Sequence, residues 1–410
     1  MAMDLTVLDD ALKVRWISEK VHNHAWKREN VFKSIKAVRK DYTGKEFSWL
    51  IETYPGEEGG FAENGAQLNT APTDEGYKRV YFDLKTMRSI RHLDIEATED
   101  AADSAGSLVQ PIKVLPKKTI ENHVFHVARN FWCDSGKLAL CGSTSGAAEV
   151  ELATTSNMRR FKRGMTCDVV ESDDGRSANK LIDSEAIVTI EEGATPSLTF
   201  TSSISTTATQ DVICYEDESY ASSTNYATYA WNGLPTLVDT GDVFNLTISS
   251  DAPEFISKVA TSTGVLSLPK MQTIVDWIEA RCEEKISEIR MSPEAAQKYG
   301  GLLIPDMRFS KELLDKMSGG QVGTTMSFKG GSMGEIPIVR DPLMPKDEIY
   351  FLTWPSFCLA TTAFLKWLNL NGTYFQWVSN YLKFALIMYS RGELGILNRN
   401  WNGKMTGVTI

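Results

Sequence analysis

The residues best suited by type and spacing to bind a metal are two histidines followed by two cysteines. His123 and His126 lie three apart in a segment with helical periodicity, and Cys133 and Cys141 follow. Two imidazoles and two thiolates could hold Zn²⁺ in a tetrahedral site. Aromatic and aliphatic residues alternate with the histidines, however, and neither cysteine has a second thiol close by. We therefore favour histidines on a helix face and buried free cysteines, and we predict no metal and no cofactor.

A weaker candidate, for nucleophilic catalysis, is the sequence GSTSG at residues 142–146. Its central residue is Thr144, where a nucleophile elbow carries serine, and all five histidines precede residue 127, so none follows to act as the base. Two glycine-rich stretches, 319–323 and 330–334, lack the Gly-Lys-Ser/Thr ending of a phosphate-binding loop. They favour loop tips instead.

Charged clusters supply the remaining candidates for chemistry. The pair Glu191–Glu192 and the cluster around Asp217 could form a glycosidase site or a calcium site, although such carboxylates more often lie on a solvated surface. The basic run at residues 159–163 (RRFKR) could hold a phosphate, but we favour a charged strand edge. Because no catalytic set results, we predict that the protein has no catalytic residues and is not an enzyme.

The elements that carry these residues belong to a folded chain. Its 410 residues are 42% apolar and 23% charged, which excludes wholesale disorder and allows roughly two to four domains. Its apolar runs fall far short of the ~20 residues that span a bilayer, the N-terminus lacks the layout of a secretion signal, and the cysteines are too dispersed for a disulfide scaffold. We expect a soluble, intracellular protein with no membrane partner.

The formal net charge of −10 is concentrated in one segment. Residues 141–262 contain 18 acidic and seven basic side chains, a net of −11, whereas residues 1–50 carry +3. The same segment is rich in Ser, Thr and Gly, and its short alternating runs and repeated turn signals predict a β-rich module. Because the acidic charge is confined to this module, the net charge does not exclude nucleic acid as a partner of the rest of the chain.

The chain before this module predicts an arm, a hairpin and a long helical stretch. Residues 1–45 have helical spacing and a local basic charge. Residues 46–90 contain two strand-like runs joined by ~20 glycine-rich residues, a hairpin that cannot bury much of its own surface. Residues 91–140 predict helix, with a break near the two prolines of VQPIKVLP.

The chain after the module predicts helices and strands in alternation. LPKMQTIVDWIEARCEEKI (268–286) has an apolar stripe at helical spacing, and a strand and a helix beginning at Ser292-Pro293 follow it. Residues 335–353 predict two strands around a Pro-x-x-Pro turn, and an aromatic-rich tail begins at Thr373.

In this order and with these lengths, the segments resemble the major capsid proteins of tailed bacteriophages, which have the Hong Kong 97-type shell fold. The run Ile336-Pro337-Ile338-Val339-x-Asp341, with Pro345 after it, is similar to part of the family's axial domain. The resemblance implies an α+β fold with the following parts: an N-terminal arm (1–45), an extended hairpin called the E-loop (46–90), a peripheral (P) domain with a long spine helix (91–140), an axial (A) domain (263–372), and a return to the P domain with a C-terminal tail (373–410). The β-rich acidic segment 141–262 is an insertion that many members of the family lack.

The resemblance also implies a function. The protein would be a structural major capsid protein that self-assembles into the icosahedral head of a tailed bacteriophage around double-stranded DNA. Its partners would be other copies of itself in hexamers and pentamers, portal and scaffolding proteins, a decoration protein on the insertion, and packaged DNA met without sequence specificity. It would reside in the virion after assembly in the cytoplasm of the host bacterium.

Aromatic and apolar residues on the arm and hairpin are the predicted subunit-interface residues, because they have little to pack on within one subunit. These residues are Trp16, Trp26, Phe61, Leu68 and Tyr77. Two other functions remain open. One is an encapsulin-type bacterial compartment shell, which shares the fold and holds protein cargo. The other is a β-rich carbohydrate-active enzyme or adhesin built on residues 141–262, in which Glu191 and Asp217 would carry activity.

Overall fold

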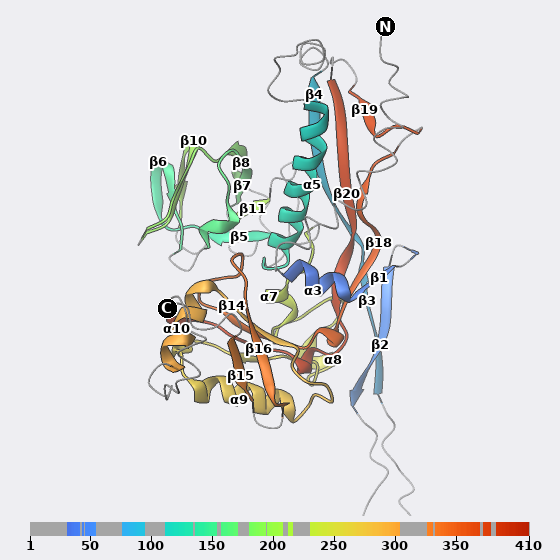
Figure 1. The fold of residues 1–410 in the computed structure, drawn as a ribbon, viewed down its shortest axis with the longest axis vertical. Coiled ribbons are helices and arrows are strands. Elements are labelled where there is room, and N and C mark those ends of the chain that lie inside the picture. Colours follow the sequence, from blue (N-terminus) through green and yellow to red (C-terminus); the bar gives the residue numbers. More distant parts are fainter. Residues whose placement is uncertain are drawn as a thin grey trace, which may run out of the picture.

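The structure is a computed structural model with a mixed α+β fold in which strands dominate. It describes residues 31–54, 76–94, 111–133, 136–153, 157–170, 180–207, 212–215, 230–303 and 326–409, except for residues 42, 45, 194, 331–332, 370–371 and 379–382. Figure 1 shows a long sheet beside a helix, a hairpin at one end, and two further bodies on the side of the helix. Among the described residues, no helix has the length and hydropathy needed to cross a bilayer.

The long sheet combines strands from the two ends of the chain. Its strands are β1 (Arg39–Asp41), β18 (Phe357–Trp367), β20 (Lys383–Ile396), β19 (Phe375–Trp377) and β4 (Lys85–Asp94). β20 pairs with β18 and β19 on one side and with β4 along ten residues on the other. The helix α3 (Val31–Ala37) precedes β1, which runs parallel to β18. The end of the arm is therefore fixed beside the last third of the chain.

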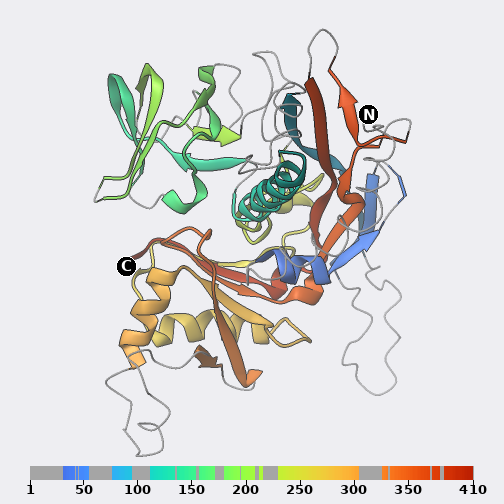
Figure 2. The same cartoon turned by 45° about the horizontal axis from the view of Figure 1, so that its top comes forward.

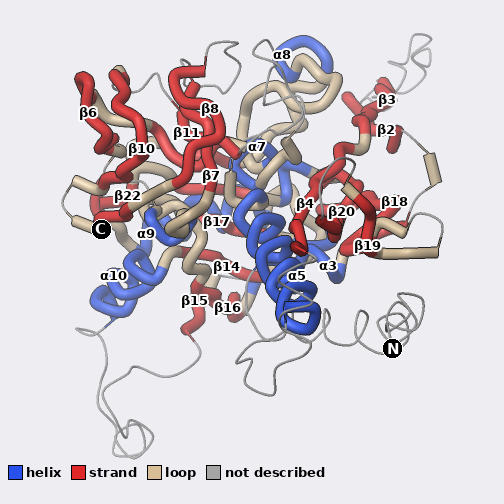
Figure 3. The backbone as a smooth tube through the Cα atoms, turned by 90° about the horizontal axis from the view of Figure 1, so that it is seen from above, coloured by secondary structure: helices blue, strands red, loops and turns tan. Residues whose placement is uncertain are grey.

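The long helix α5 (Pro111–Asn130) packs on one face of this sheet, and in Figure 3 it lies directly against β4 and β20. Helix was predicted over 91–140, but the chain is strand up to Asp94 and strand again from Lys137. The predicted break at the prolines is wrong. Pro111 opens the helix, where an amide hydrogen has no partner anyway, and Pro116 lies inside it at the cost of one backbone hydrogen bond.

The predicted hairpin is confirmed as an antiparallel pair, β2 (Glu46–Tyr54) and β3 (Gly76–Asp83). Its second strand is shorter than the sequence suggested. After Leu84 the chain enters β4 and leaves the hairpin for the long sheet. The alternation of side chains continues through Leu84 without a turn signal, so the sequence gives no sign that the strand changes partners.

A second body consists of a six-stranded sheet covered by two helices. In spatial order its strands are β12 (Lys258–Ala260), β21 (Gly403–Met405), β17 (Ile349–Leu352), β14 (Glu288–Met291), β16 (Glu335–Arg340) and β15 (Met326–Lys329). The helices are α9 (Leu268–Glu279) and α10 (Pro293–Leu303), and two-residue strands β13 (Gly264–Val265) and β22 (Val408–Thr409) pair beside them.

Most local predictions for this body are confirmed, but not the pairing. α9 buries its apolar stripe, and Ser292 accepts a hydrogen bond at Oγ from the Ala295 amide at the start of α10. β16 and β17 are both strands, as predicted. They do not pair with each other, because β14 lies between them, parallel to β16 and antiparallel to β17.

The β-rich module consists of two small sheets around their own apolar core (Figure 2). One contains β6 (Thr144–Glu151), β10 (Ser197–Thr206) and β9 (Thr189–Glu191), and the other β5 (Lys137–Leu140), β11 (Val212–Tyr215), β7 (Thr166–Val170) and β8 (Lys180–Ala186). A short 3-10 helix, η1 (Met158–Arg160), follows β6.

The predicted span 141–262 contains two kinds of structure. Its described strands up to Tyr215 form the module, with β5 starting just before the span. Residues 231–255, with the short helices α7 (Leu234–Leu237) and α8 (Ile248–Asp251), pack instead into the core of the long sheet and α5. Both parts are rich in Ser, Thr and turn residues, so composition alone does not separate them. Two further 3-10 turns, η4 (Trp354–Ser356) and η5 (Arg399–Trp401), flank the sheets.

Candidate assembly surfaces and the junctions that hold them

The two faces of the hairpin differ in what they contact. The register places Phe47 opposite Phe82 and Trp49 opposite Val80 on one face. This face packs on Phe244, whose ring centroid lies 5.2 Å from that of Phe82 and 5.5 Å from that of Trp49. The aromatic cluster fixes the base of the hairpin to the body of the subunit.

The opposite face of the hairpin exposes large apolar side chains. Leu50 is 69% exposed, Tyr77 60% and Tyr81 43%. A contiguous exposed apolar patch is a candidate site of contact with another molecule. Of the predicted interface residues, Tyr77 lies on this face. The other four (Trp16, Trp26, Phe61 and Leu68) lie outside the described residues.

Asn245, which the sequence analysis did not single out, forms hydrogen bonds with the edge of the hairpin. Asn245 accepts a hydrogen bond at Oδ1 from the Tyr81 amide, 2.9 Å away, and donates from Nδ2 to the Arg79 carbonyl, 3.1 Å away. The Asn245 side chain thus pairs with the backbone N–H and C=O groups of β3 as a neighbouring strand would. Beside it, Lys78 forms an ion pair with Asp251 of α8. Nothing in the local sequence indicates that an asparagine 164 residues away closes this edge.

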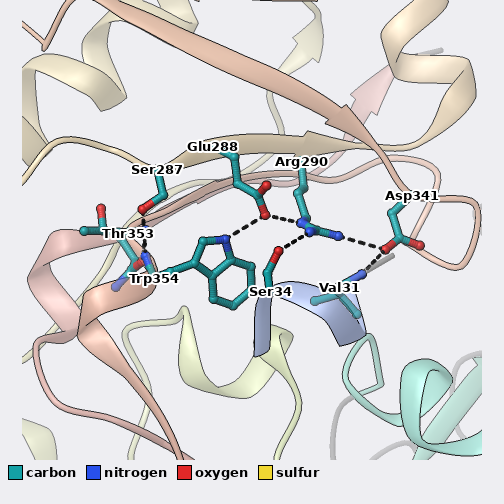
Figure 4. Close-up of polar contacts among 9 residues, drawn as sticks. Val31, Ser34, Ser287, Glu288, Arg290, Asp341, Thr353 and Trp354 are labelled. Atoms are coloured by element: carbon teal, nitrogen blue, oxygen red, sulfur yellow. Dashed lines mark hydrogen bonds and ion pairs between the residues drawn. The ribbon is translucent and has the colours of Figure 1, made fainter. Parts of the chain in front are cut away.

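The arm is joined to the second body through Arg290, a buried side chain on β14 (Figure 4). Its guanidinium donates to Glu288 Oε1 at 2.5 Å, to Asp341 Oδ2 at 3.1 Å and to Ser34 Oγ of α3 at 2.8 Å. Asp341 Oδ2 also accepts from the Val31 amide, at 3.0 Å, in the first turn of α3. An acid is favourable there because the first amides of a helix lack internal partners.

This network satisfies each charge that it buries. Glu288 Oε1 accepts a second hydrogen bond from Trp354 Nε1 at 2.8 Å, and Asp341 Oδ1 accepts one from the Leu343 amide at 3.0 Å. Removing one partner from a buried pair leaves the other charge uncompensated, which typically costs about 3–5 kcal/mol. The Arg290 network therefore determines where the arm leaves the body of the subunit.

The β-rich module is held by the run that was predicted to be a charged strand edge, and that prediction is wrong. Arg160 is buried and donates to the carbonyls of Leu343, Leu138 and Trp132 at 2.8–3.1 Å. Asn157 donates from Nδ2 to two further carbonyls of residues 342–344. A buried arginine with three carbonyl acceptors joins the module, the end of α5 and the second body at one point.

The candidates for metal and catalytic chemistry have structural partners. Both ring nitrogens of His123 lie 2.8 Å from a serine hydroxyl, Ser89 on β4 and Ser390 on β20, and burial lowers its pKa to about 4. Cys133 donates from Sγ to the Arg129 carbonyl. The described residues contain no group of three His, Cys, Asp or Glu side chains that could hold a metal. Glu191 is exposed at the end of β9, and Asp217 lies outside the described residues.

Comparison with known proteins identifies the fold. No family model matches the sequence, and no curated protein matches it. Among solved structures, the capsid asymmetric unit of cyanophage A-1(L) is similar over 91% of this chain and 91% of that chain, with a TM-score of 0.55 and 10% sequence identity. The fold is that of a phage capsid protein.

Two other similar structures are shells as well. One is the capsid of the native GTA particle, 10% identical, which covers 92% of this chain and 90% of its own with a TM-score of 0.47. The other is the SrpI encapsulin complex of Synechococcus elongatus PCC 7942, 7% identical, which covers 100% of this chain and 96% of its own with a TM-score of 0.43. The predicted resemblance to the capsid fold is confirmed by the cyanophage structure.

Proposed function

We propose that this protein is a major capsid protein that self-assembles into the icosahedral head of a tailed bacteriophage enclosing double-stranded DNA. The observation that supports this most is the hairpin: within a capsid fold, its outer face leaves Leu50, Tyr77 and Tyr81 open to solvent. A single subunit gains nothing from exposing such residues, whereas a repeated contact with a second copy buries them.

The parts of the Hong Kong 97-type fold are assigned from the order and lengths of the segments. Residues 1–45 are proposed as the N-terminal arm, 46–90 as the E-loop, α5 as the spine helix of the P domain, 263–372 as the A domain, and 373–410 as the return to the P domain. The β-rich module is proposed as an outward-facing insertion, whose acidic charge would keep particles apart. Trp16, Trp26, Phe61 and Leu68 stay predictions for the subunit interfaces beside Tyr77.

The proposed role has no catalytic residues and no cofactor. The partners would be further copies of the chain in hexamers and pentamers, portal and scaffolding proteins, a decoration protein on the insertion, and DNA without sequence specificity. The protein would reside in the virion after assembly in the bacterial cytoplasm.

Expression of the full chain, alone and with a scaffolding protein, tests the proposal by negative-stain imaging and sedimentation velocity. We expect closed particles of uniform size. A species that stays at the monomer mass of 45.6 kDa under every condition would contradict it. Particles that contain protein cargo and never DNA would instead indicate an encapsulin-type compartment.

A further inference from the structure

The connector loop (residues 341–348), which joins β16 to β17, is held by the β-rich module. Pro342, Leu343 and Met344 present three consecutive carbonyls, and each accepts a hydrogen bond from a side chain of the module. Asn157 donates from Nδ2 to the first and the third, and Arg160 donates from Nε to the second. Both donors are buried, and a buried polar group without a partner is costly. The module therefore stabilises one backbone arrangement of the connector loop.

The same loop also holds the start of α3 (Figure 4). Asp341 Oδ2 accepts hydrogen bonds from the Val31 amide at 3.0 Å and from Arg290 at 3.1 Å, and Arg290 also donates to Ser34 of α3. The loop itself orients this carboxylate, because Asp341 Oδ1 accepts from the Leu343 amide at 3.0 Å. The Asp341 side chain is buried. The helix α3 is thus docked on a carboxylate whose direction depends on the backbone of the connector loop.

One peptide unit, between Pro342 and Leu343, takes part in both sets of contacts. Its carbonyl oxygen accepts from Asn157 Nδ2 at 2.8 Å, and its N–H donates to Asp341 Oδ1. The unit is trans, and a trans peptide unit is planar, so its C=O and N–H point in opposite directions and turn together. A rotation that takes the carbonyl away from Asn157 therefore also takes the amide away from Asp341.

The flanks of the connector loop are fixed to the second body. The Asp341 amide donates to the Met291 carbonyl at the end of β14, at 3.1 Å. Ser292 donates from Oγ to the Lys346 carbonyl, at 3.0 Å. Because both flanks are anchored, a change in the middle of the loop is not absorbed by a shift of the whole loop. It must instead rotate the peptide units that lie between the anchors.

We propose that the connector loop couples the β-rich module to the arm. The turn 157–160 of the module and the helix α3 stabilise the same orientation of one peptide unit. Two groups that favour the same conformation of a shared element stabilise each other, and the coupling free energy is the same in both directions. Release of the turn should loosen α3, and release of α3 should loosen the turn. The coupling lies within one chain and does not depend on the protein forming a shell.

Amide hydrogen exchange in the dilute full-length chain tests the coupling with two conservative variants. Asn157→Ser keeps a side-chain oxygen for the Arg159 amide, which Asn157 caps at 3.1 Å, and loses the donor to the loop carbonyls. Ser34→Ala removes a hydrogen-bond acceptor from α3. The control is Thr189→Val, at an exposed threonine of the module whose hydroxyl bonds within its own sheet. Thermal unfolding establishes that each variant is folded.

The expected changes in exchange rate lie on the far side of the loop from each substitution. In Asn157→Ser, the Val31 amide should exchange about tenfold faster, as the loss of two hydrogen bonds to the loop would allow. In Ser34→Ala, the Arg160 amide, which donates to the Asn157 carbonyl at 3.1 Å, should exchange about threefold faster. Thr189→Val should leave the Val31 amide at the wild-type rate.

Two comparisons separate coupling from a general loss of stability. The Ala280 amide of α9, which donates to the Asp276 carbonyl, should keep its wild-type rate in both variants. In the double variant, the acceleration at Val31 should be smaller than the product of the two single accelerations, because either release already removes the shared stabilisation.

An unchanged rate at Val31 in Asn157→Ser would overturn the proposal, and so would an equal acceleration at Ala280. Accelerations that multiply in the double variant would also overturn it, since the module and the arm would then act independently. If Asn157→Ser does not fold, Ser34→Ala decides the question from the other direction. A wild-type rate at Arg160 in that variant would contradict the coupling.

Discussion

The junctions inside the subunit and the hairpin that leaves it place their side chains in opposite ways. At the arm junction, Arg290 is buried with acceptors from β14, from Asp341 and from α3. On the hairpin, one face is packed on Phe244 while the other exposes Leu50 and Tyr77. The polar groups of the junctions find their partners within one chain, whereas the outer face of the hairpin is exposed to solvent. Substitutions at the two regions should therefore affect different measurements.

The largest effect on folding is expected at the arm junction. Arg290→Met leaves Glu288 and Asp341 as buried acids without their cation, so the free energy of unfolding should fall by about 3–5 kcal/mol. Urea denaturation of the monomer measures it. Arg163→Met, at an exposed arginine after η1, is the control and should change stability by less than about 0.5 kcal/mol. A similarly small loss of stability for Arg290→Met would contradict the view that the buried Arg290 network stabilises the fold more than the exposed face of the hairpin does.

The junction of α5 with the long sheet should be sensitive to pH. The pKa of His123 is about 4 in the folded protein, below the value near 6.5 expected when unfolded, so the unfolded chain binds more protons between these values. The contribution of neutral His123 to the free energy of unfolding is fully present above about pH 6.5. It is lost as the pH falls toward 4, and the loss amounts to up to about 3 kcal/mol.

The difference between wild type and His123→Gln, followed by denaturation from pH 7 to pH 4, measures this contribution. The variant should show a flatter dependence on pH than wild type. His92→Gln, at an exposed histidine on β4, serves as the control and should keep the wild-type dependence. Equal pH profiles for wild type and His123→Gln would contradict the assignment.

A smaller effect is expected where the hairpin meets the body. Asn245→Ala removes two hydrogen bonds to β3, which should lower stability by about 1 kcal/mol and speed amide exchange at Tyr81. Asn245→Asp keeps the acceptor for that amide and loses the donor to the Arg79 carbonyl. Its exchange at Tyr81 should stay closer to wild type. Exchange that is unchanged in Asn245→Ala would show that the aromatic cluster alone holds the hairpin.

The smallest effect on folding, with a large effect on assembly, is expected on the outer face of the hairpin. Leu50→Ser should change the free energy of unfolding by less than about 0.5 kcal/mol, because the side chain is mostly exposed. It should raise the critical concentration for assembly about tenfold, which corresponds to about 1.4 kcal/mol. Val265→Ser, at an equally exposed aliphatic residue on β13, is the comparison outside the hairpin. Equal assembly by both variants and wild type would show that the outer face makes no contact.

Features that depend on neighbours along the chain could be predicted from the sequence. The apolar stripe of α9, the strand pair of the hairpin and the strand character of β16 and β17 follow from local periodicity, which reports which face of an element is buried. The order and lengths of the segments were enough to predict the capsid fold. The acidic charge is a property of one segment, and the sequence alone locates it.

Tertiary structure alone decided which elements and polar groups meet. β4 continues the pattern of the hairpin yet pairs with β20, whose residues lie 289 to 307 positions later in the chain, and β14 separates β16 from β17. The Val31 amide meets Asp341 across 310 residues. Arg160, by type a surface residue, is buried because folding brings three carbonyls around it. Periodicity reports how much of a side chain is buried, but the partner of a buried charge depends on distant segments that only the folded chain brings together.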